Sequence, residues 1–211
     1  MPRLIFDLDG TLLDVKERHY AVYSDCLSEF GVAPLTTDEY WTRRRSGEGT
    51  VQIASDEHPL VIRDLFQNLW LERIESRDWL PIDALFSGSF ALLDVLRGRY
   101  ELVLATLRRD RDALMDQLGW LGIDVFFDHI ISPEDTTYSG SKFDMVKPLR
   151  PNDHTWVIGD SEADVVLAQE LGAELICVTN GVRDESFLRA TGATQLIPCV
   201  CALPALLPSA D

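Results

Sequence analysis

The sequence lacks the long apolar runs and the cysteine spacings that mark several classes of protein. No stretch of the 211 residues approaches the ~20 uninterrupted apolar residues of a transmembrane helix, and the N-terminus shows no apolar run of the signal-peptide type. The cysteines, Cys26, Cys177, Cys199 and Cys201, have no C-x-x-C spacing, so no zinc or redox site is indicated. We therefore expect a cytoplasmic protein without membrane association, in which the cysteines are buried thiols in a reducing compartment.

Positive charge is also scarce. The chain has 19 Lys and Arg residues against 35 Asp and Glu residues, and its net charge of −16 opposes binding to a nucleic-acid backbone. No internal repeat or low-complexity tract is visible. A protein this acidic that handles an anionic ligand must build a local positive pocket, for which metal ions, lysines and helix N-termini are the candidates.

The apolar pattern divides the chain into two kinds of segment. From about residue 87, short runs rich in Val, Ile and Leu alternate with helical segments, which predicts a parallel sheet covered by helices on both faces. Residues from about 15 to 86 show helical periodicity instead. We therefore predict an α/β fold with a Rossmann-like, doubly wound parallel sheet (residues 1–14 and 87–211) and an inserted α-helical cap domain (15–86).

An apolar run at the N-terminus leads directly into two carboxylates. Asp7 and Asp9 are separated by one residue, and alternate side chains of an extended segment share a face. Gly10 then lets the chain turn away sharply. Two carboxylates this close repel each other unless a cation lies between them, so a hard, oxygen-seeking ion such as Mg²⁺ is the expected ligand.

Polar residues also end two later apolar runs. Thr106 ends one, and Asp160 follows another. Asp164 comes four residues after Asp160, on the same face of a helix that begins there. In open parallel sheets the ligand binds beyond the carboxyl ends of the strands, so we expect these residues to meet the two N-terminal carboxylates at one edge of the sheet.

In this order the residues resemble the four motifs of the haloacid dehalogenase (HAD) superfamily, in its phosphatase-type members. The motifs are Asp7-Leu8-Asp9-Gly10-Thr11, the strand-ending Thr106, a lysine, and Gly159-Asp160 with Asp164. The resemblance spans Asp7 to Asp164, most of the chain, and implies a Mg²⁺-dependent phosphomonoester hydrolase. The helical segment resembles the cap that many members carry between the first and second motifs.

The resemblance implies catalytic and metal-binding roles for the carboxylates. Asp7 would be the nucleophile that forms an aspartyl-phosphate, and Asp9 would protonate the leaving oxygen and then take a proton from the attacking water. Mg²⁺ would be held by Asp7, the backbone carbonyl of Asp9, and Asp160. Asp164 would bind the ion directly, bind it through water, or hold its neighbours in place, and the sequence does not choose among these.

Three further residues are expected to bind the substrate and its phosphoryl group. Thr106 would donate its hydroxyl group to the phosphate, and Gly10 belongs to the same phosphate-binding region. Leu107 is also expected to contact the substrate. It stands where a small polar residue such as Asn is frequent in the family, so the residue at this position departs from the common pattern.

Two lysines are candidates for the cationic role. Lys142 follows Ser139-Gly140-Ser141, a loop at the start of an expected helix over residues 142–149, and can project towards the phosphate. Lys147 precedes Pro148, as in the Lys-Pro of many relatives, but is expected in the middle of that helix with a solvated side chain. We therefore assign Lys142 to catalysis and to substrate binding.

The helical segment contains Arg43, Arg44 and Arg45 in succession. Successive helical residues are about 100° apart, so at most two of the three can face the site. Arg45, which is nearest to the loop that contains Gly47 and Gly49, is the predicted substrate anchor, with a solvated basic face as the alternative. His19 lies near the hinge, where related phosphatases and phosphosugar mutases both often carry a histidine, so it does not separate the two.

Several alternatives remain. A phosphosugar mutase would use the same Asp7 and Asp9, and a non-catalytic phosphate-binding relative would lack turnover. A phosphonatase would need a Schiff-base lysine in the cap, where only Lys16 is present. Dehalogenases proper lack the second aspartate, so Asp9 favours phosphoryl chemistry. The expected partner is a small phosphoester, and the sequence indicates neither its identity nor the oligomeric state.

Overall fold

The computed structural model describes residues 1–133, 141–149, 152 and 154–208. Its main sheet has six parallel strands in the order β5-β4-β1-β6-β7-β8. They are β1 (Arg3–Phe6), β4 (Glu101–Ala105), β5 (His129–Ile131), β6 (Thr155–Gly159), β7 (Glu174–Val178) and β8 (Leu196–Ile197). The predicted parallel sheet is therefore confirmed, with β1 between β4 and β6.

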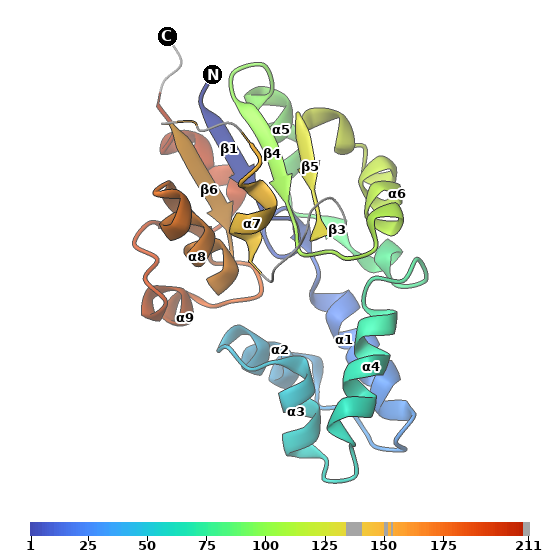
Figure 1. Ribbon diagram of the computed structural model, residues 1–211. Helices are drawn as coiled ribbons and strands as arrows, with labels where there is room; N and C mark the ends of the chain where they lie inside the picture. The colour runs from blue at the N-terminus through green and yellow to red at the C-terminus, as the bar shows by residue number, and fades with distance from the viewer. Residues whose placement is uncertain (134–140, 150–151, 153, 209–211) are drawn as a thin grey trace.

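Alternate residues of the strands face two separate cores, as the two-residue repeat of a strand requires. On one side Phe6, Leu104 and Ile158 pack with helices α5 (Ser89–Leu96) and α6 (Arg111–Leu121) and with the 3-10 segment η4 (Val200–Ala205). On the other side Ile5, Val103 and Val157 pack with α7 (Lys142–Val146) and α8 (Glu162–Leu171). Figure 1 shows α7 and α8 in front of the sheet and α5 behind it. The doubly wound arrangement is thus confirmed.

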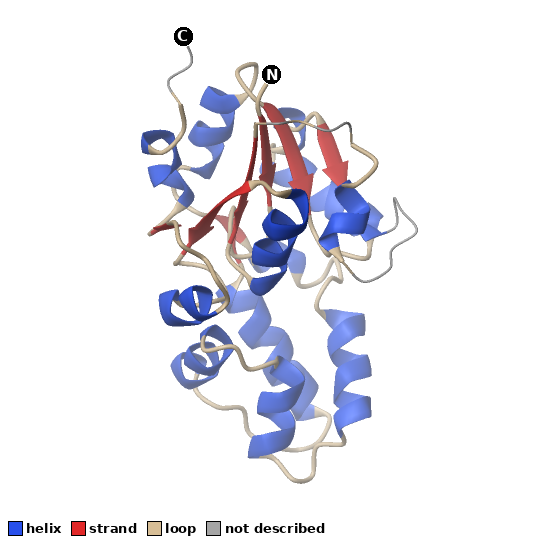
Figure 2. Ribbon diagram, turned by 60° about the vertical axis from the view of Figure 1, so that its left-hand side comes forward, coloured by secondary structure: helices blue, strands red, loops and turns tan. Residues whose placement is uncertain are grey.

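Four helices form a separate layer below the carboxyl ends of the strands (Figures 1 and 2). They are α1 (Lys16–Ser28), α2 (Thr37–Arg45), α3 (Thr50–Glu57) and α4 (Arg63–Arg73). Three short segments, η1 (Leu80–Ile82), η2 (Asp124–Phe126) and α9 (Glu185–Ala190), complete the described elements. The boundaries of two domains at residues 14/15 and 86/87 remain our proposal.

The chain enters and leaves the helical layer through a pair of short strands. Strand β2 (Leu13–Asp14) pairs antiparallel with β3 (Ala84–Leu85), with Leu13 opposite Leu85. Just beyond this pair, the amide of Phe86 donates to the carbonyl of Leu12 over 2.9 Å. Both crossings between the two parts of the chain therefore lie side by side.

The helical segment follows its sequence pattern in one place and departs from it in another. The spacing of Thr36 and Glu39 predicts a capping box, and the two residues do exchange hydrogen bonds at the start of α2. The helical spacing of Ile62, Leu65, Phe66, Leu69 and Trp70 predicts a buried stripe on one helix. This prediction is wrong in part, because Ile62 and Leu65 are more than half exposed, whereas Phe66 is fully buried and Leu69 and Trp70 pack against the core. Helix α4 packs on α1 and α3.

The cysteines follow the prediction only in part. Cys26 and Cys177 are buried free thiols, as expected. Cys199 and Cys201 are joined by a disulfide, and Cys201 is exposed. They lie at the start of η4, where the short spacing brings both side chains together, so the prediction of four buried thiols is wrong for this pair. No helix in the described part of the chain has the length and apolar character needed to span a bilayer.

Candidate active site

The predicted site residues meet at the carboxyl ends of three adjacent strands. Asp7 follows β1, Thr106 follows β4 and Asp160 follows β6. Because β1 pairs with both β4 and β6, these ends lie next to one another. Thr106 and Asp160 are almost fully buried. The convergence expected from the strand pattern is therefore present.

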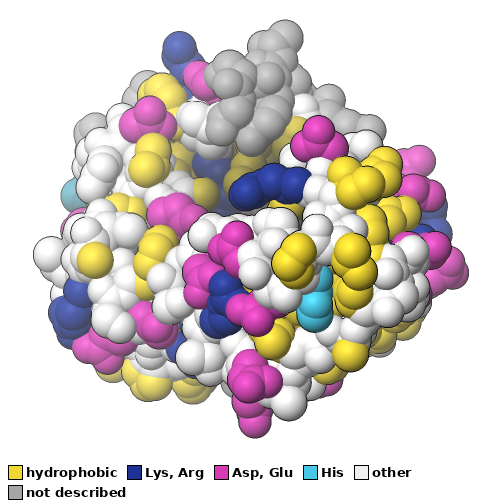
Figure 3. Space-filling model, turned by 90° about the horizontal axis from the view of Figure 1, so that it is seen from below, with side chains coloured by type: hydrophobic (Ala, Val, Ile, Leu, Met, Phe, Trp, Pro, Cys, Tyr) yellow, Lys and Arg dark blue, Asp and Glu magenta, His cyan; other side chains and the backbone are white. Residues whose placement is uncertain are grey.

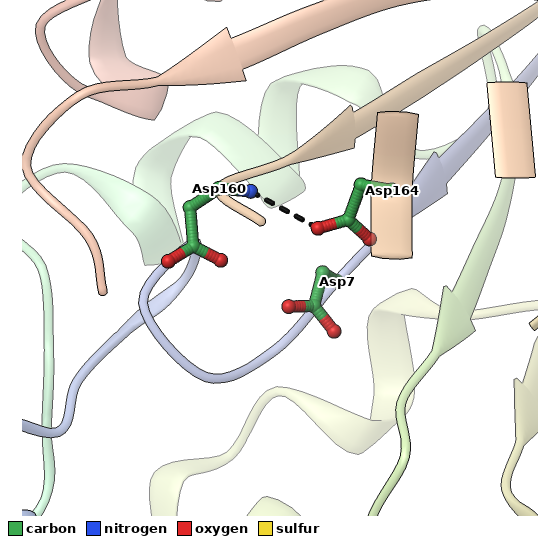
Figure 4. A group of neighbouring side chains, drawn as sticks. All are labelled: Asp7, Asp160 and Asp164. Atoms are coloured by element: carbon green, nitrogen blue, oxygen red, sulfur yellow. Dashed lines mark hydrogen bonds between the residues drawn. The ribbon is translucent and has the colours of Figure 1, made fainter. Parts of the chain in front are cut away.

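Three buried carboxylates form a cluster at this edge (Figure 4). Asp7, Asp160 and Asp164 each offer an oxygen atom, and these atoms lie within 4.8 Å of one another. Nζ of Lys142 lies 2.6 Å from Asp7 and 2.7 Å from Asp164. A single lysine balances only part of this negative charge, which leaves the cluster suited to a divalent cation.

The backbone fixes the two later carboxylates in place. Asp164 lies in the first turn of α8 and accepts from the amides of Asp160, at 3.2 Å, and Ser161, at 3.1 Å. Asp160 accepts from the hydroxyl group of Thr11 at 3.2 Å and from the amide of Val182 at 2.6 Å. These bonds hold both side chains in one orientation before any ligand binds.

Glycine is required where other segments approach Asp160. A Cβ atom on Gly10 would lie 2.1 Å from an oxygen of Asp160, and Gly10 has φ +83°, which disfavours other residues. A Cβ atom on Gly181 would lie 2.2 Å from the same oxygen. Gly10, predicted to bind substrate, therefore lies against a carboxylate of the cluster and is absent from the cavity wall described below.

Burial and mutual repulsion alter the protonation of the cluster. Burial raises the pKa of Asp7 from 3.8 to about 7, with Lys142 opposing the rise. Burial also raises the pKa of Asp160 well above its usual range. Burial opposes the charged form of Lys142, but Asp164 and Asp7 raise its pKa. A cation bound among the carboxylates would reverse the shifts of the two aspartates, so the donor set fits Mg²⁺.

Asp9 lies in a different environment, between two buried arginines. Nε and Nη2 of Arg108 donate to its two oxygens at 2.5 and 2.6 Å, and Arg18 donates to it at 3.0 Å. Burial opposes the ionised form, but the two guanidinium groups hold the pKa of Asp9 well below its usual range. Asp83, which accepts from Arg18 and from Gln117 at 2.9 Å, completes the network.

A cavity of about 450 Å³ lies between the sheet edge and the helical layer. The core contributes Asp7, Asp9, Thr106, Leu107, Arg108, Lys142 and Asp160, and the helical layer contributes Arg18, His19, Arg44, residues 49–52, Arg63 and Trp70. Figure 3 views the molecule from the side of the helical layer and shows Lys and Arg side chains in and beside the hollow near the middle of that face. The predicted local positive pocket is therefore present in a strongly acidic protein.

The structure separates the competing candidates among lysines and arginines. Lys142 is buried against Asp7, whereas Lys147 is exposed and lies outside this cavity. The segment before Lys142, Ser139-Gly140, lies outside the described residues. Arg45 donates to the carbonyl of Thr179 and is absent from the cavity wall, whereas Arg44 lines it. The choice of Arg45 as the residue facing the cavity is thus corrected to Arg44, which points about 100° away from it on α2.

Sequence reasoning missed the partners of Asp9. Arg108 follows Thr106 by two residues in the same loop after the strand. Its position just beyond a strand end is therefore a sequence signal that could have identified it. Arg18 and Asp83 come from the two ends of the helical segment, and no sequence signal indicates that they meet.

Comparison with known proteins places this geometry in a family. The model of the haloacid dehalogenase-like hydrolases matches residues 4–178. A phosphoglycolate phosphatase from Rhodobacter capsulatus is 26% identical over 190 residues, which cover 86% of each chain. A haloacid dehalogenase-like hydrolase from Streptococcus pneumoniae has a similar structure, with a TM-score of 0.78, 22% identity and 98% of each chain covered. A Thermotoga maritima structure assigned to a β-phosphoglucomutase has a TM-score of 0.70, 20% identity and 98% coverage of each chain. The chain belongs to the haloacid dehalogenase-like hydrolase family.

Proposed function

We propose that this chain is a Mg²⁺-dependent phosphomonoester hydrolase that acts on a small phosphorylated metabolite through an aspartyl-phosphate. One observation carries the proposal: Asp7 lies at the base of the cavity, 2.6 Å from Lys142 and within 4.8 Å of Asp160 and Asp164. A carboxylate next to a fixed cation and a metal-binding cluster is suited to attack on a phosphorus atom. Phosphoglycolate, the substrate in the name of the Rhodobacter relative, is one candidate.

The chain's own residues account for binding and positioning of the phosphoryl group. Asp7 would attack the phosphorus, while Lys142 and the hydroxyl group of Thr106 contact the phosphoryl oxygens. Asp7, Asp160 and the backbone carbonyl of Asp9 would hold Mg²⁺, with Asp164 a ligand or a support. When bound, Mg²⁺ would supply positive charge that stabilises the phosphoryl oxygens in the transition state.

Asp9 would move the protons in both halves of the reaction. In the first half it gives a proton to the oxygen of the leaving alcohol, and in the second half it accepts one from the water that attacks the phosphorus. The ion pairs with Arg108 and Arg18 keep Asp9 ionised in the structure, which is the form that the second half uses. For the first half Asp9 must first take up a proton from solvent, which requires these ion pairs to loosen.

Turnover of a panel of phosphomonoesters tests this proposal. With Mg²⁺ we expect phosphate release from at least one small phosphoester, and EDTA should abolish it. A mutase would instead require a bisphosphate activator and return a phosphorylated product. Full activity in EDTA would contradict the metal dependence, and the lack of any turnover would favour a non-catalytic relative.

A further inference from the structure

The helical layer places Arg44 in the cavity wall without a carboxylate partner among the described residues. Of three consecutive arginines, Arg43 forms ion pairs with Glu48 and Glu57, and Arg45 donates to a backbone carbonyl. Within the described residues Arg44 has no carboxylate partner, and Nη1 donates only to the carbonyl of Glu48, at 2.5 Å. Nε of Arg44 is buried and has no hydrogen-bond partner. A half-buried guanidinium group that lines a cavity and has unused donors can bind an anion.

The N-terminus of α3 lies beside Arg44 in the same wall. The cap residue, Gly49, has an extended conformation and no side chain to accept from the first amides of the helix. The amides of Thr50, Val51 and Gln52 have no acceptor in the part of the chain that the structure describes, and residues 49–52 all line the cavity. These open donors and the helix dipole favour a negative group here.

The other cations of the cavity have partners, belong to the phosphoryl end or are exposed. Arg63 also lines the cavity and has no ion pair within the described residues, but its side chain is exposed. Arg18 and Arg108 are paired with Asp9 and Asp83, and Lys142 is paired with two carboxylates of the cluster. His19 lines the cavity next to Arg18, and burial lowers its pKa well below its ordinary value, so the ring is neutral. Arg44 and the end of α3 together therefore offer about one and a half positive charges without an ion-pair partner among the described residues.

We propose that Arg44 and the N-terminus of α3 form a subsite for a carboxylate, so that the substrate is a small phosphorylated carboxylic acid. The proposal rests on the proposed function, because the phosphoryl end would lie at Asp7 and Lys142 in the same cavity of about 450 Å³. A carboxylate carries one charge and matches a guanidinium group with two parallel hydrogen bonds. A second phosphoryl group carries nearly two charges, which exceeds what this subsite supplies.

Two substrates of equal size test the subsite. 2-Phosphoglycolate and 2-hydroxyethyl phosphate differ in whether a carboxylate or a hydroxymethyl group follows the phosphorylated carbon. We expect the wild type to favour the carboxylate in kcat/KM by at least about tenfold, the range of a charged hydrogen bond. Arg44→Gln should lose about 10–100-fold on 2-phosphoglycolate, mainly through KM, and less than about threefold on 2-hydroxyethyl phosphate. Arg43→Gln, the matched change one residue earlier, should keep the preference.

A second variant avoids dependence on Arg44. Gly49 has room for a side chain, since a Cβ atom there would meet nothing within 4 Å. Gly49→Asp would cap α3 with its own carboxylate, so we expect an equal or higher melting temperature together with weaker use of 2-phosphoglycolate. Unchanged use of 2-phosphoglycolate in this variant, or an equal loss on both substrates in Arg44→Gln, would overturn the subsite.

A failure of the proposed function can be told apart from a failure of the subsite. If the wild type hydrolyses 2-hydroxyethyl phosphate as well as 2-phosphoglycolate, the subsite is wrong and the hydrolase assignment stands. If it hydrolyses neither, calorimetric binding of the two compounds to wild type and Arg44→Gln decides the subsite by itself. Tighter binding of 2-phosphoglycolate that Arg44→Gln removes would support the subsite, and equal binding of both compounds would overturn it.

Discussion

Asp7 and Asp9 are separated by one residue but have opposite surroundings. Asp7 lies among carboxylates with Lys142, and its pKa is raised to about 7 by burial. Asp9 lies between Arg108 and Arg18, which lower its pKa against the effect of burial. The same type of side chain is therefore placed once beside a carboxylate cluster suited to a cation, as a nucleophile requires, and once beside permanent cations, which keep it ionised.

This difference predicts separate effects of two amide substitutions. With p-nitrophenyl phosphate, whose leaving group needs no proton, Asp9→Asn should still allow phosphorylation of Asp7 but should stall hydrolysis. Asp9→Asn should then gain one phosphate per chain by mass spectrometry, and Asp7→Asn should gain none because the attacking oxygen is gone. Phosphate accumulating on Asp7→Asn would contradict both assignments.

The two lysines predict a second contrast. Lys142→Ala should lose ~10²-fold or more in kcat, because it removes a cation at the phosphoryl group. Lys147 is exposed and outside the cavity, so Lys147→Ala should remain near wild type in steady-state turnover. The reverse pattern would transfer the cationic role to Lys147.

At the scale of elements, the loop after β7 supports the metal-binding cluster from outside. The amide of Val182 donates to Asp160 at 2.6 Å. A Cβ atom on the preceding Gly181 would lie 2.2 Å from the same carboxylate and 2.3 Å from the carbonyl of Gly10. The loop can approach this closely only because position 181 has no side chain.

We therefore expect Gly181→Ala to displace Asp160, to weaken Mg²⁺ binding measured by calorimetry, and to lower the melting temperature. Gly119→Ala is the control, since Gly119 lies within α6 and a Cβ atom there meets nothing within 4 Å. The control should be neutral or stabilising by up to about 1 kcal/mol, as for Gly to Ala in a helix. Wild-type Mg²⁺ affinity in Gly181→Ala would show that the loop does not position Asp160.

Most elements of the sheet and its helices could be predicted because their signals are local. The apolar run over residues 101–106 predicts a strand, and β4 spans Glu101–Ala105. The helical repeat over residues 161–171, followed by Gly172, predicts a helix, and α8 spans Glu162–Leu171. The apolar residues that repeat along these two elements are the ones that are buried in the structure. Placing polar residues at strand ends then led to the carboxylate cluster.

The remaining elements depend on contacts between distant segments. Strands β2 and β3 have two residues each and exist only because they pair. Helix α3 was not expected, since Gly47 and Gly49 indicate a flexible loop before it. Arg44 differs from Arg45 only by its angle on α2, and that angle relative to the cavity is set by how α2 packs on the core.

At the scale of the whole molecule, the helical layer is docked onto the core on two sides of the cavity. The carbonyls of Arg44 and Arg45 accept from Arg183, at 2.7 Å, and from the amide of Asp184, at 2.9 Å. On the other side Glu75 accepts from the amide of Arg109 at 2.7 Å. Both contacts join loops that carry site residues, so docking of the helical layer and assembly of the cavity are linked.

From the proposed metal site we expect the stability of the whole protein to depend on Mg²⁺ and pH. The pKa of Asp7 is raised from 3.8 to about 7, so its contribution to stability is full below about pH 4 and is lost as the pH rises through about 7. Mg²⁺ requires the ionised form. We expect the increase in melting temperature caused by Mg²⁺ to be larger at about pH 8 than at about pH 5.5.

Asp7→Asn provides the control for this dependence. The amide cannot titrate, so Mg²⁺ should raise the melting temperature of this variant less, and the difference between the two pH values should shrink to the part that Asp160 contributes. An equal effect of Mg²⁺ at the two pH values in the wild type would mean that Asp7 is not linked to the metal.

The paired crossings at β2 and β3 have a consequence for how such a protein can change. Paired strands lie only about 5 Å apart. The two ends of the segment over residues 15–83 are therefore as close together as the two ends of a hairpin turn. Loop-closure entropy grows only slowly with length, and here the closure is secured by Leu13 opposite Leu85. A segment attached in this way can be lengthened, shortened or exchanged while the sheet still holds Asp7 and Asp160, provided that Arg18 and Asp83, which belong to the network around Asp9, are kept. Residues that select the substrate, in the helical segment, can then change while the carboxylates on the sheet are kept.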